Sequence, residues 1–156
     1  MHARNSLSMY HANRCNDAVA HRRWSLMPEA FTKVSLAAVD DAAPGNGFGD
    51  RWEARVARDA LGAQRTGVTL FRLLPGKRSP FTHRHTAAEE IYVVLSGSGR
   101  VKLDDELLDV GPLDSIRVAP ATARAFEAGQ EGLEFLAFGP HHPGDGEAVQ
   151  DAWTDQ

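Results

Sequence analysis

The feature that most constrains this chain is a series of short apolar segments that begins near Gly67 and is interrupted by turn residues. Proline and glycine stand between the segments, as in Pro75-Gly76 and Gly111-Pro112. Many short strands with this punctuation predict an all-β sandwich or barrel. No sustained 3.6-residue period is present, which argues against a helix bundle or a βαβ fold. The segments are 68–74, 91–95, 100–103, 106–110, 115–118, 124–128 and 133–138.

The connecting stretches carry less specific patterns. Residues 96–99 and 129–132 are rich in glycine and predict turns. Upstream, residues 31–39 predict a first strand, whereas residues 51–61 fit either a strand or a short helix. The tail, 141–156, is rich in glycine and aspartate, and we expect it to lie over the surface.

Charge divides the chain of 156 residues into two parts. Residues 1–26 contain four arginines and one aspartate, a net charge of +3, whereas residues 27–156 contain 13 Lys/Arg and 20 Asp/Glu, a net charge of −7. An acidic body is a poor partner for nucleic acid or an anionic membrane surface. No run approaches the ~18 uncharged apolar residues that span a bilayer.

The first 26 residues differ in composition from the rest. They hold the one cysteine, Cys15, which excludes a disulfide scaffold, and they lack the apolar core of a secretory signal. Met27 and Pro28 could mark the natural start. We therefore expect 1–26 to be a disordered or non-native extension, 27–156 to be a single domain, and the protein to be cytoplasmic.

His83, His85 and Glu90 form the constellation with the clearest chemistry. In a strand, His83 and His85 point to the same side, about 6.6 Å apart along the backbone. A short turn then leads to Glu90 at the start of the next apolar strand. Two imidazoles and one carboxylate on one face are the ligands of a two-His-one-carboxylate metal site. A bare His-x-His pair is common, but the carboxylate and the strand that follows make this one more specific.

The strand that begins at Glu90 is apolar on both faces. Tyr92 and Val94 share the face of Glu90, and the opposite face of residues 91–95 is apolar as well. We therefore expect this strand to be covered on one side by the barrel interior and on the other by a second layer or a second subunit.

The segment from Gly76 to Gly97 resembles the first conserved motif of the cupins. That motif runs Gly, about five residues, His-x-His, three or four residues, Glu, six residues, Gly. This chain has six residues in the first gap, and Glu90 leaves six residues before Gly97. The resemblance covers roughly residues 67–139. It implies a small single-domain cupin of the type-2 conserved-barrel kind, that is, a jelly-roll β-barrel.

The second cupin motif is incomplete here. In the stretch from Gly111 to Ala128, Arg124 stands where the motif has a histidine ligand, and Ala128 stands where it has an asparagine. Arginine is permanently protonated and cannot bind a metal. A guanidinium ~4 Å from a divalent ion would be repelled by ~8 kcal/mol at an effective dielectric of ~20. The resemblance therefore implies three metal ligands of the usual four.

Two outcomes follow for Arg124, and the sequence leaves both open. In the first, Arg124 turns aside or binds an anionic ligand, and a three-residue metal site keeps open positions for water or substrate. In the second, Arg124 replaces the metal as the cation and pairs with Glu90. In either, strand parity brings Phe126 inward with Arg124, so that Tyr92 and Phe126 are candidate walls of a ligand pocket, although inward aromatic residues usually serve packing.

These observations favour a cupin that binds or acts on a small molecule. The resemblance implies Fe, Mn, Ni or Zn at His83, His85 and Glu90, and it makes a homodimer the expected assembly. The alternative is a metal-free barrel that binds or senses a small anion through Arg124. No residue in the sequence selects a reaction or identifies a general base.

Overall fold

The computed structural model describes residues 30–149 and residue 153. The chain divides into two compact units, Met1–Thr32 and Lys33–Gln156, and the barrel belongs to the second. The predictions made for residues 1–26, including Cys15, lie outside the described residues.

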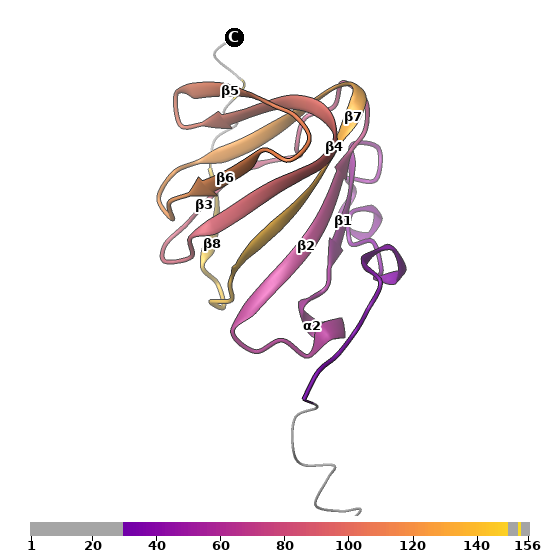
Figure 1. The fold of residues 1–156 in the computed structure, drawn as a ribbon. Coiled ribbons are helices and arrows are strands. Elements are labelled where there is room, and N and C mark those ends of the chain that lie inside the picture. Colours follow the sequence, from indigo (N-terminus) through magenta and orange to yellow (C-terminus); the bar gives the residue numbers. More distant parts are fainter. Residues whose placement is uncertain (1–29, 150–152, 154–156) are drawn as a thin grey trace, which may run out of the picture. The chain divides into compact units, whose positions relative to one another are not determined.

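The second unit is built mainly from antiparallel strands, as predicted (Figure 1). The three helical segments within residues 30–149 are short: η1 (Leu36–Ala38), η2 (Pro44–Asn46) and α2 (Arg58–Leu61). None of the helices within residues 30–149 is long and apolar enough to span a membrane. The strands are β1 (Trp52–Val56), β2 (Thr66–Leu73), β3 (Thr82–His85), β4 (Glu90–Leu103), β5 (Glu106–Val110), β6 (Ser115–Val118), β7 (Arg124–Pro140) and β8 (Gly146–Val149).

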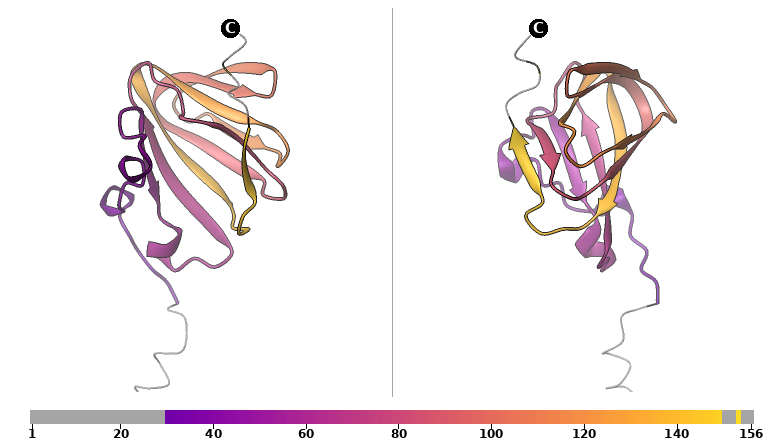
Figure 2. Two further views of the ribbon diagram at one scale, coloured as in Figure 1. Left: turned by 180° about the vertical axis from the view of Figure 1, so that it is seen from behind. Right: turned by 90° about the vertical axis from the view of Figure 1, so that its left-hand side faces the viewer.

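Two long strands, β4 and β7, hold the barrel together. They pair along most of their length, from Ile91 opposite Phe138 to Leu103 opposite Arg124. β7 also pairs with β2, which carries β1 at its edge, and β4 also pairs with β5 and β6. β3 lies between β7 and β8. The sheet therefore curls around a common interior, as the two further views in Figure 2 show. This is the all-β barrel that the strand pattern predicted.

The turns predicted at residues 96–99 and 129–132 are wrong. β4 and β7 continue through both stretches and bend there, with register shifts between Val94 and Ser96 and between Gly97 and Gly99. Gly97 and Gly132 have positive φ angles of 75° and 82°. A bulge in a continuous strand needs glycine for the same steric reason as a turn, so composition alone does not distinguish the two.

Three other local predictions are corrected by the structure. Residues 31–39 contain the single turn η1 and no strand, and residues 51–61 contain both of the expected alternatives, β1 followed by α2. The tail does not simply cover the surface, because β8 pairs with β3 and places Gly146 opposite His85. This pairing joins residues far apart in the sequence, and no local sequence pattern predicts it.

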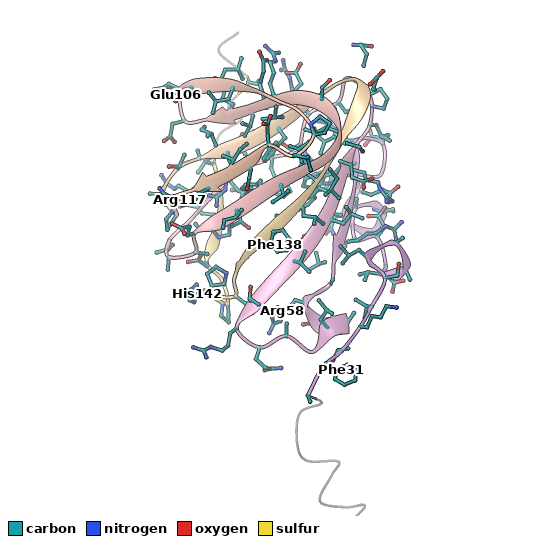
Figure 3. The ribbon with its side chains drawn as sticks, viewed as in Figure 1. Phe31, Arg58, Glu106, Arg117, Phe138 and His142 are labelled. Atoms are coloured by element: carbon teal, nitrogen blue, oxygen red, sulfur yellow. The ribbon has the colours of Figure 1, made fainter. Side chains whose placement is uncertain are left out.

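The barrel interior contains the predicted inward face of β4. Tyr92 and Val94 are buried, whereas Ile91 and Leu95 on the outer face are 42% and 39% exposed. Phe138, which pairs with Ile91 and is labelled in Figure 3, is also partly exposed. Within the described residues, no second layer covers this outer face, so that part of the prediction does not hold within the chain.

The bend of β4 gives a test of the fold. A Cβ atom at Gly99 would lie 2.1 Å from the carbonyl oxygen of Glu127, which belongs to the β7 backbone and cannot move aside cheaply. Gly99→Ala should therefore lower the free energy of unfolding by about 1–3 kcal/mol in a urea titration. Gly111→Ala is the control, because nothing lies within 4 Å of its added Cβ. Equal stabilities of the two variants would contradict this packing.

Candidate functional site

The site lies where β3, β4 and β7 meet. His83 and His85 point to the same side of β3, and their rings lie 5.3 Å apart in an edge-to-face arrangement. Glu90 at the start of β4 faces them, with its Oε2 3.7 Å from His83 Nε2 and 3.3 Å from His85 Nε2. One ligand atom from each of the three residues lies within 4.8 Å of the others. The structure thus brings together the three residues that strand parity proposed as metal ligands.

Arg124 pairs with the same carboxylate oxygen of Glu90 that faces the two histidines. Its Nη2 donates to Glu90 Oε2 at 2.9 Å, and its Nε donates to the Tyr92 hydroxyl at 3.2 Å. Tyr92 in turn donates its own hydroxyl proton to Glu90 Oε2. Arg124 occupies this position because it lies opposite His83 in the register between β3 and β7.

The guanidinium of Arg124 has no exposed surface and is nearly saturated with hydrogen bonds. Besides Glu90 and Tyr92, it donates through Nη1 to the carbonyl oxygens of Thr122 at 3.0 Å and Pro120 at 3.3 Å. Four of the five N–H donors of an arginine are therefore used within the described part of the chain. The Arg124 guanidinium therefore has little capacity left to donate hydrogen bonds to an external anion.

Asp145 holds His85 from behind and was not identified from the sequence. Its Oδ2 lies 3.0 Å from His85 Nδ1, and its carboxylate also accepts the amides of Ala87 and Ala88. Burial opposes ionisation, but these two amides and the His85 ring outweigh it and hold the pKa of Asp145 below its usual value. An ionised carboxylate only accepts, so the His85 Nδ1 donates its proton to Asp145, and Nε2 is the ring nitrogen left to bind a metal.

The site stabilises a charged Glu90 and a neutral Tyr92. Burial alone would raise the pKa of Glu90, but hydrogen bonds from His83 and Tyr92 and the charge of Arg124 outweigh burial and lower this pKa to about 2. Burial, followed by the negative charge of Glu90, raises the pKa of Tyr92 well above its ordinary value. Tyr92 therefore remains a phenol that donates to Glu90.

The donor set fits a divalent metal ion. His85 Nε2 is buried and has no hydrogen-bond partner among the described residues, and it faces Glu90. Two donor atoms bound at about 2.1 Å in a tetrahedral arrangement lie about 3.4 Å apart, close to the 3.3 and 3.7 Å between Glu90 Oε2 and the two histidines. Asp145 supplies the carboxylate that orients a metal-binding histidine. His83, His85 and Glu90 could thus hold the ion, with Arg124 outside the ligand set.

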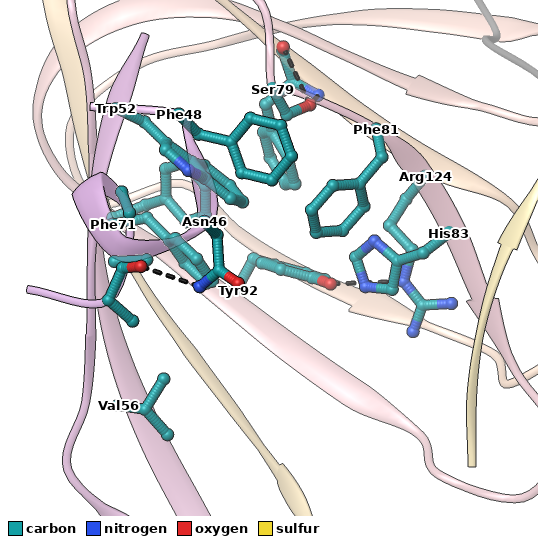
Figure 4. Close-up of a pocket in the computed structure, with 15 residues that line it drawn as sticks. Asn46, Phe48, Trp52, Val56, Phe71, Ser79, Phe81, His83, Tyr92 and Arg124 are labelled. Atoms are coloured by element: carbon teal, nitrogen blue, oxygen red, sulfur yellow. Dashed lines mark hydrogen bonds between the residues drawn. The ribbon is translucent and has the colours of Figure 1, made fainter. Parts of the chain in front are cut away.

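A cavity of about 370 Å³ opens beside this cluster (Figure 4). His83, Tyr92, Arg124 and Phe126 line it, and it is bounded mainly by aromatic rings. We call it the aromatic cavity. Its lining residues are Ala42, Ala43, Asn46, Phe48, Trp52, Ala54, Val56, Phe71, Ser79, Phe81, His83, Tyr92, Arg124, Phe126 and Phe135.

Comparison with known proteins agrees with this architecture. A family model described as a cupin domain matches residues 69–139, from β2 to the end of β7. Residues 69–139 belong to the cupin family. The match covers β3, β4 and the start of β7, and so it includes every metal-ligand candidate. Asp145 lies beyond its end.

Several solved structures share this fold. A cupin protein from Bacteroides fragilis is 25% identical, covers 79% of this chain and 93% of its own, and has a TM-score of 0.60. A sugar phosphate isomerase from Silicibacter pomeroyi is 22% identical over 76% of this chain and 82% of its own, with a TM-score of 0.64. The polyketide cyclase RemF from Streptomyces resistomycificus is 24% identical over 76% and 85%, with a TM-score of 0.63. At these identities, the last two show the fold alone.

A curated relative matches a shorter stretch. An uncharacterized protein from Methanocaldococcus jannaschii is 34% identical over 55 residues, which is 35% of this chain and 44% of the relative. The matched stretch thus spans less than half of the relative's length.

The residues proposed from the sequence converge in the structure, and two contributions were missed. Tyr92, Arg124 and Phe126 all line the aromatic cavity, next to His83. Asp145 was missed because only the pairing of β8 with β3 brings it to His85. The wall formed by residues 42–56 was missed because no motif or strand alternation connects that segment with the histidines. Its aromatic residues, Phe48 and Trp52, are the one available sequence signal.

The low pKa of Glu90 predicts a specific acid sensitivity. Because folding lowers this pKa from 4.5 to about 2, ionised Glu90 stabilises the fold above about pH 4.5, and this contribution is lost as the pH falls toward 2. With chelator present, the stability advantage of the wild type over Glu90→Gln should be on the order of 3 kcal/mol at pH 6 and should shrink over that range. Urea titrations at each pH measure it.

Glu89→Gln is the matched control, since it removes an exposed carboxylate from the neighbouring position. A wild-type advantage over Glu90→Gln that stays constant between pH 6 and pH 2 would contradict the ion-pair network.

Proposed function

We propose that this cupin binds a divalent transition metal through His83, His85 and Glu90 and binds or acts on a small molecule in the adjoining aromatic cavity. The observation that carries the proposal is the buried, unpartnered Nε2 of His85, which faces Glu90 at 3.3 Å in a cluster of three ligand atoms. Imidazole and carboxylate donors suit first-row metals such as Fe, Mn, Ni and Zn.

The protein's own groups have separate roles in this proposal. A metal with open positions polarises a bound oxygen or activates water. Asp145 orients the His85 ring, and Arg124 and Tyr92 hold the Glu90 carboxylate in place. His83 lines the cavity, so a small molecule there lies next to the cluster.

A second candidate function, a metal-free binding barrel, is favoured by one observation. Arg124 stands at the position of a missing ligand and already neutralises Glu90 at 2.9 Å. In this alternative the guanidinium takes the place of the ion, and the histidines only donate or accept hydrogen bonds. The buried Nε2 of His85 then needs a partner from the bound small molecule.

Metal analysis distinguishes the two candidates. Full-length protein that has been treated with chelator and then dialysed against Zn²⁺, Mn²⁺, Ni²⁺ or Fe²⁺ should retain about one equivalent of at least one metal and melt at a higher temperature. His85→Ala should weaken this binding by about 100-fold or more, because it removes a ligand. His142→Ala is the control, since His142 is exposed and outside the cluster. No retained metal and no effect of chelator on the melting temperature would refute metal binding.

Two further variants sharpen the result. Asp145→Asn keeps the shape of the side chain but weakens its hold on His85, and metal affinity should fall by about 10–100-fold. Arg124→His removes the buried cation and adds a possible fourth ligand. If the wild type binds a metal, this variant should therefore bind that metal with higher affinity. If Arg124→His gains metal while the wild type has none, the metal-free alternative is correct.

We also propose that the protein forms a homodimer through the outer face of β4. Ile91 and Leu95 leave apolar surface exposed there, and exposed apolar patches of this kind mark interaction sites. Sedimentation of a monomer at micromolar concentration would contradict this assembly.

A further inference from the structure

We propose that the aromatic cavity takes a planar, uncharged aromatic molecule of one or two rings that carries a polar oxygen substituent at the His83 end. The direction of the polar substituent rests on the function proposed above. The aromatic body of the ligand rests on the cavity alone.

The walls of the cavity are aromatic faces and edges from several elements. Trp52 of β1 stacks on Phe71 of β2 with centroids 4.8 Å apart, and Phe126 stacks on Phe135 within β7 at 4.4 Å. Phe81, just before β3, lies edge-to-face with Trp52, with ring centroids 5.7 Å apart and an interplanar angle of 89°. Figure 4 shows rings from the η2 loop, β1, β2 and β4 gathered around one space. A planar ring extends such stacked and edge-to-face contacts better than a saturated ring of equal size.

The protein's own side chains offer an anionic ligand no free cation in this cavity. Arg124 is the one permanent cation among the lining residues, and it is wholly buried and paired with Glu90. A phosphate or carboxylate placed here would lose its hydration without gaining a free cation, which is costly. These contacts therefore do not favour the alternative in which Arg124 holds an anion.

Ser79 and Asn46, two of the polar lining residues, are hydrogen-bonded within the protein, whereas the Trp52 Nε1 donor is buried without a hydrogen-bond partner among the described residues and could serve one oxygen of a ligand. Ser79 Oγ accepts from the amide of Phe126 at 2.8 Å and donates to its carbonyl oxygen at 3.2 Å, and Asn46 Nδ2 donates to Ala42. A polyol such as a sugar phosphate would leave most of its hydroxyl groups without partners in this cavity. His83 is the lining group that remains available at the polar end, where it adjoins Glu90.

The size of the cavity agrees with this class of ligand. An apolar cavity of about 150 Å³ is large enough to hold benzene. The volume here, about 370 Å³, therefore accommodates two fused rings and a substituent.

The proposal is tested with 2-naphthol as the probe, using full-length protein both with chelator and after metal loading. Isothermal titration calorimetry should show 2-naphthol binding about tenfold more tightly than decahydro-2-naphthol, its saturated analogue, because only the planar ring stacks on the walls. Glucose 6-phosphate should not bind. After metal loading, 2-naphthol should bind more tightly than naphthalene, since its oxygen reaches the His83 end.

Two phenylalanines of equal exposure provide a matched pair of variants. Phe81 lines the cavity and Phe138 does not, and both are 38% exposed. Phe81→Ala should weaken 2-naphthol binding by about five- to tenfold, whereas Phe138→Ala should change it by less than twofold. Phe81→Leu keeps an apolar side chain without the ring and should also weaken binding. Circular dichroism and gel filtration confirm that each variant has the fold and oligomeric state of the wild type.

The possible failures are distinguishable. Tighter binding of glucose 6-phosphate than of 2-naphthol, or equal losses in Phe81→Ala and Phe138→Ala, would overturn the aromatic ligand. Metal binding without 2-naphthol binding would overturn it and leave the proposed metal site standing. Binding of 2-naphthol by a protein that retains no metal would support the aromatic ligand and refute the metal-dependent function.

Discussion

A fully buried guanidinium needs an anion beside it, and the interior of this barrel is organised around that requirement. Transfer of an unpaired charge from water into a protein interior is too costly for a marginally stable domain. Glu90 supplies the compensating charge for Arg124, Tyr92 bridges the two, and the carbonyl oxygens that precede β7 take up further donors. Glu90 begins β4 and Arg124 begins β7, and these antiparallel strands begin at opposite ends of their shared ladder, so this ion pair links the two longest strands across the barrel interior.

The same carboxylate also faces the two histidines, so the ion pair and the candidate metal site share Glu90. Asp145 fixes His85 from the other side, and His83 borders the aromatic cavity. The Arg124 guanidinium, the ring nitrogens of the two histidines and the aromatic cavity therefore lie within a few side chains of one another. In the proposed function, this arrangement would place a small molecule next to the metal in a partly buried site, where electrostatic interactions are stronger than in water.

How far the sequence predicted this structure depended on how local each feature is. β5 and β6 have the bounds predicted for them, because turn residues close both ends of each strand. His83, His85 and Glu90 could be grouped because strand alternation and one short turn relate them. The bends of β4 and β7 were mistaken for turns, because the glycines of a bulge resemble those of a hairpin. Asp145 is 60 residues from His85 along the chain, and no local pattern connects the two.

The sequence by itself determined the class of fold, the common face of the two histidines and the presence of a permanent cation where cupins carry a ligand. These follow from alternation along a strand and from the chemistry of individual side chains, which need no knowledge of distant partners. Only the tertiary structure decided that Arg124 pairs with Glu90, that Asp145 orients His85 and that aromatic residues from β1 and β2 wall the cavity. Each of these depends on the register between strands far apart in the chain, and that register is set by burial of the whole sheet face.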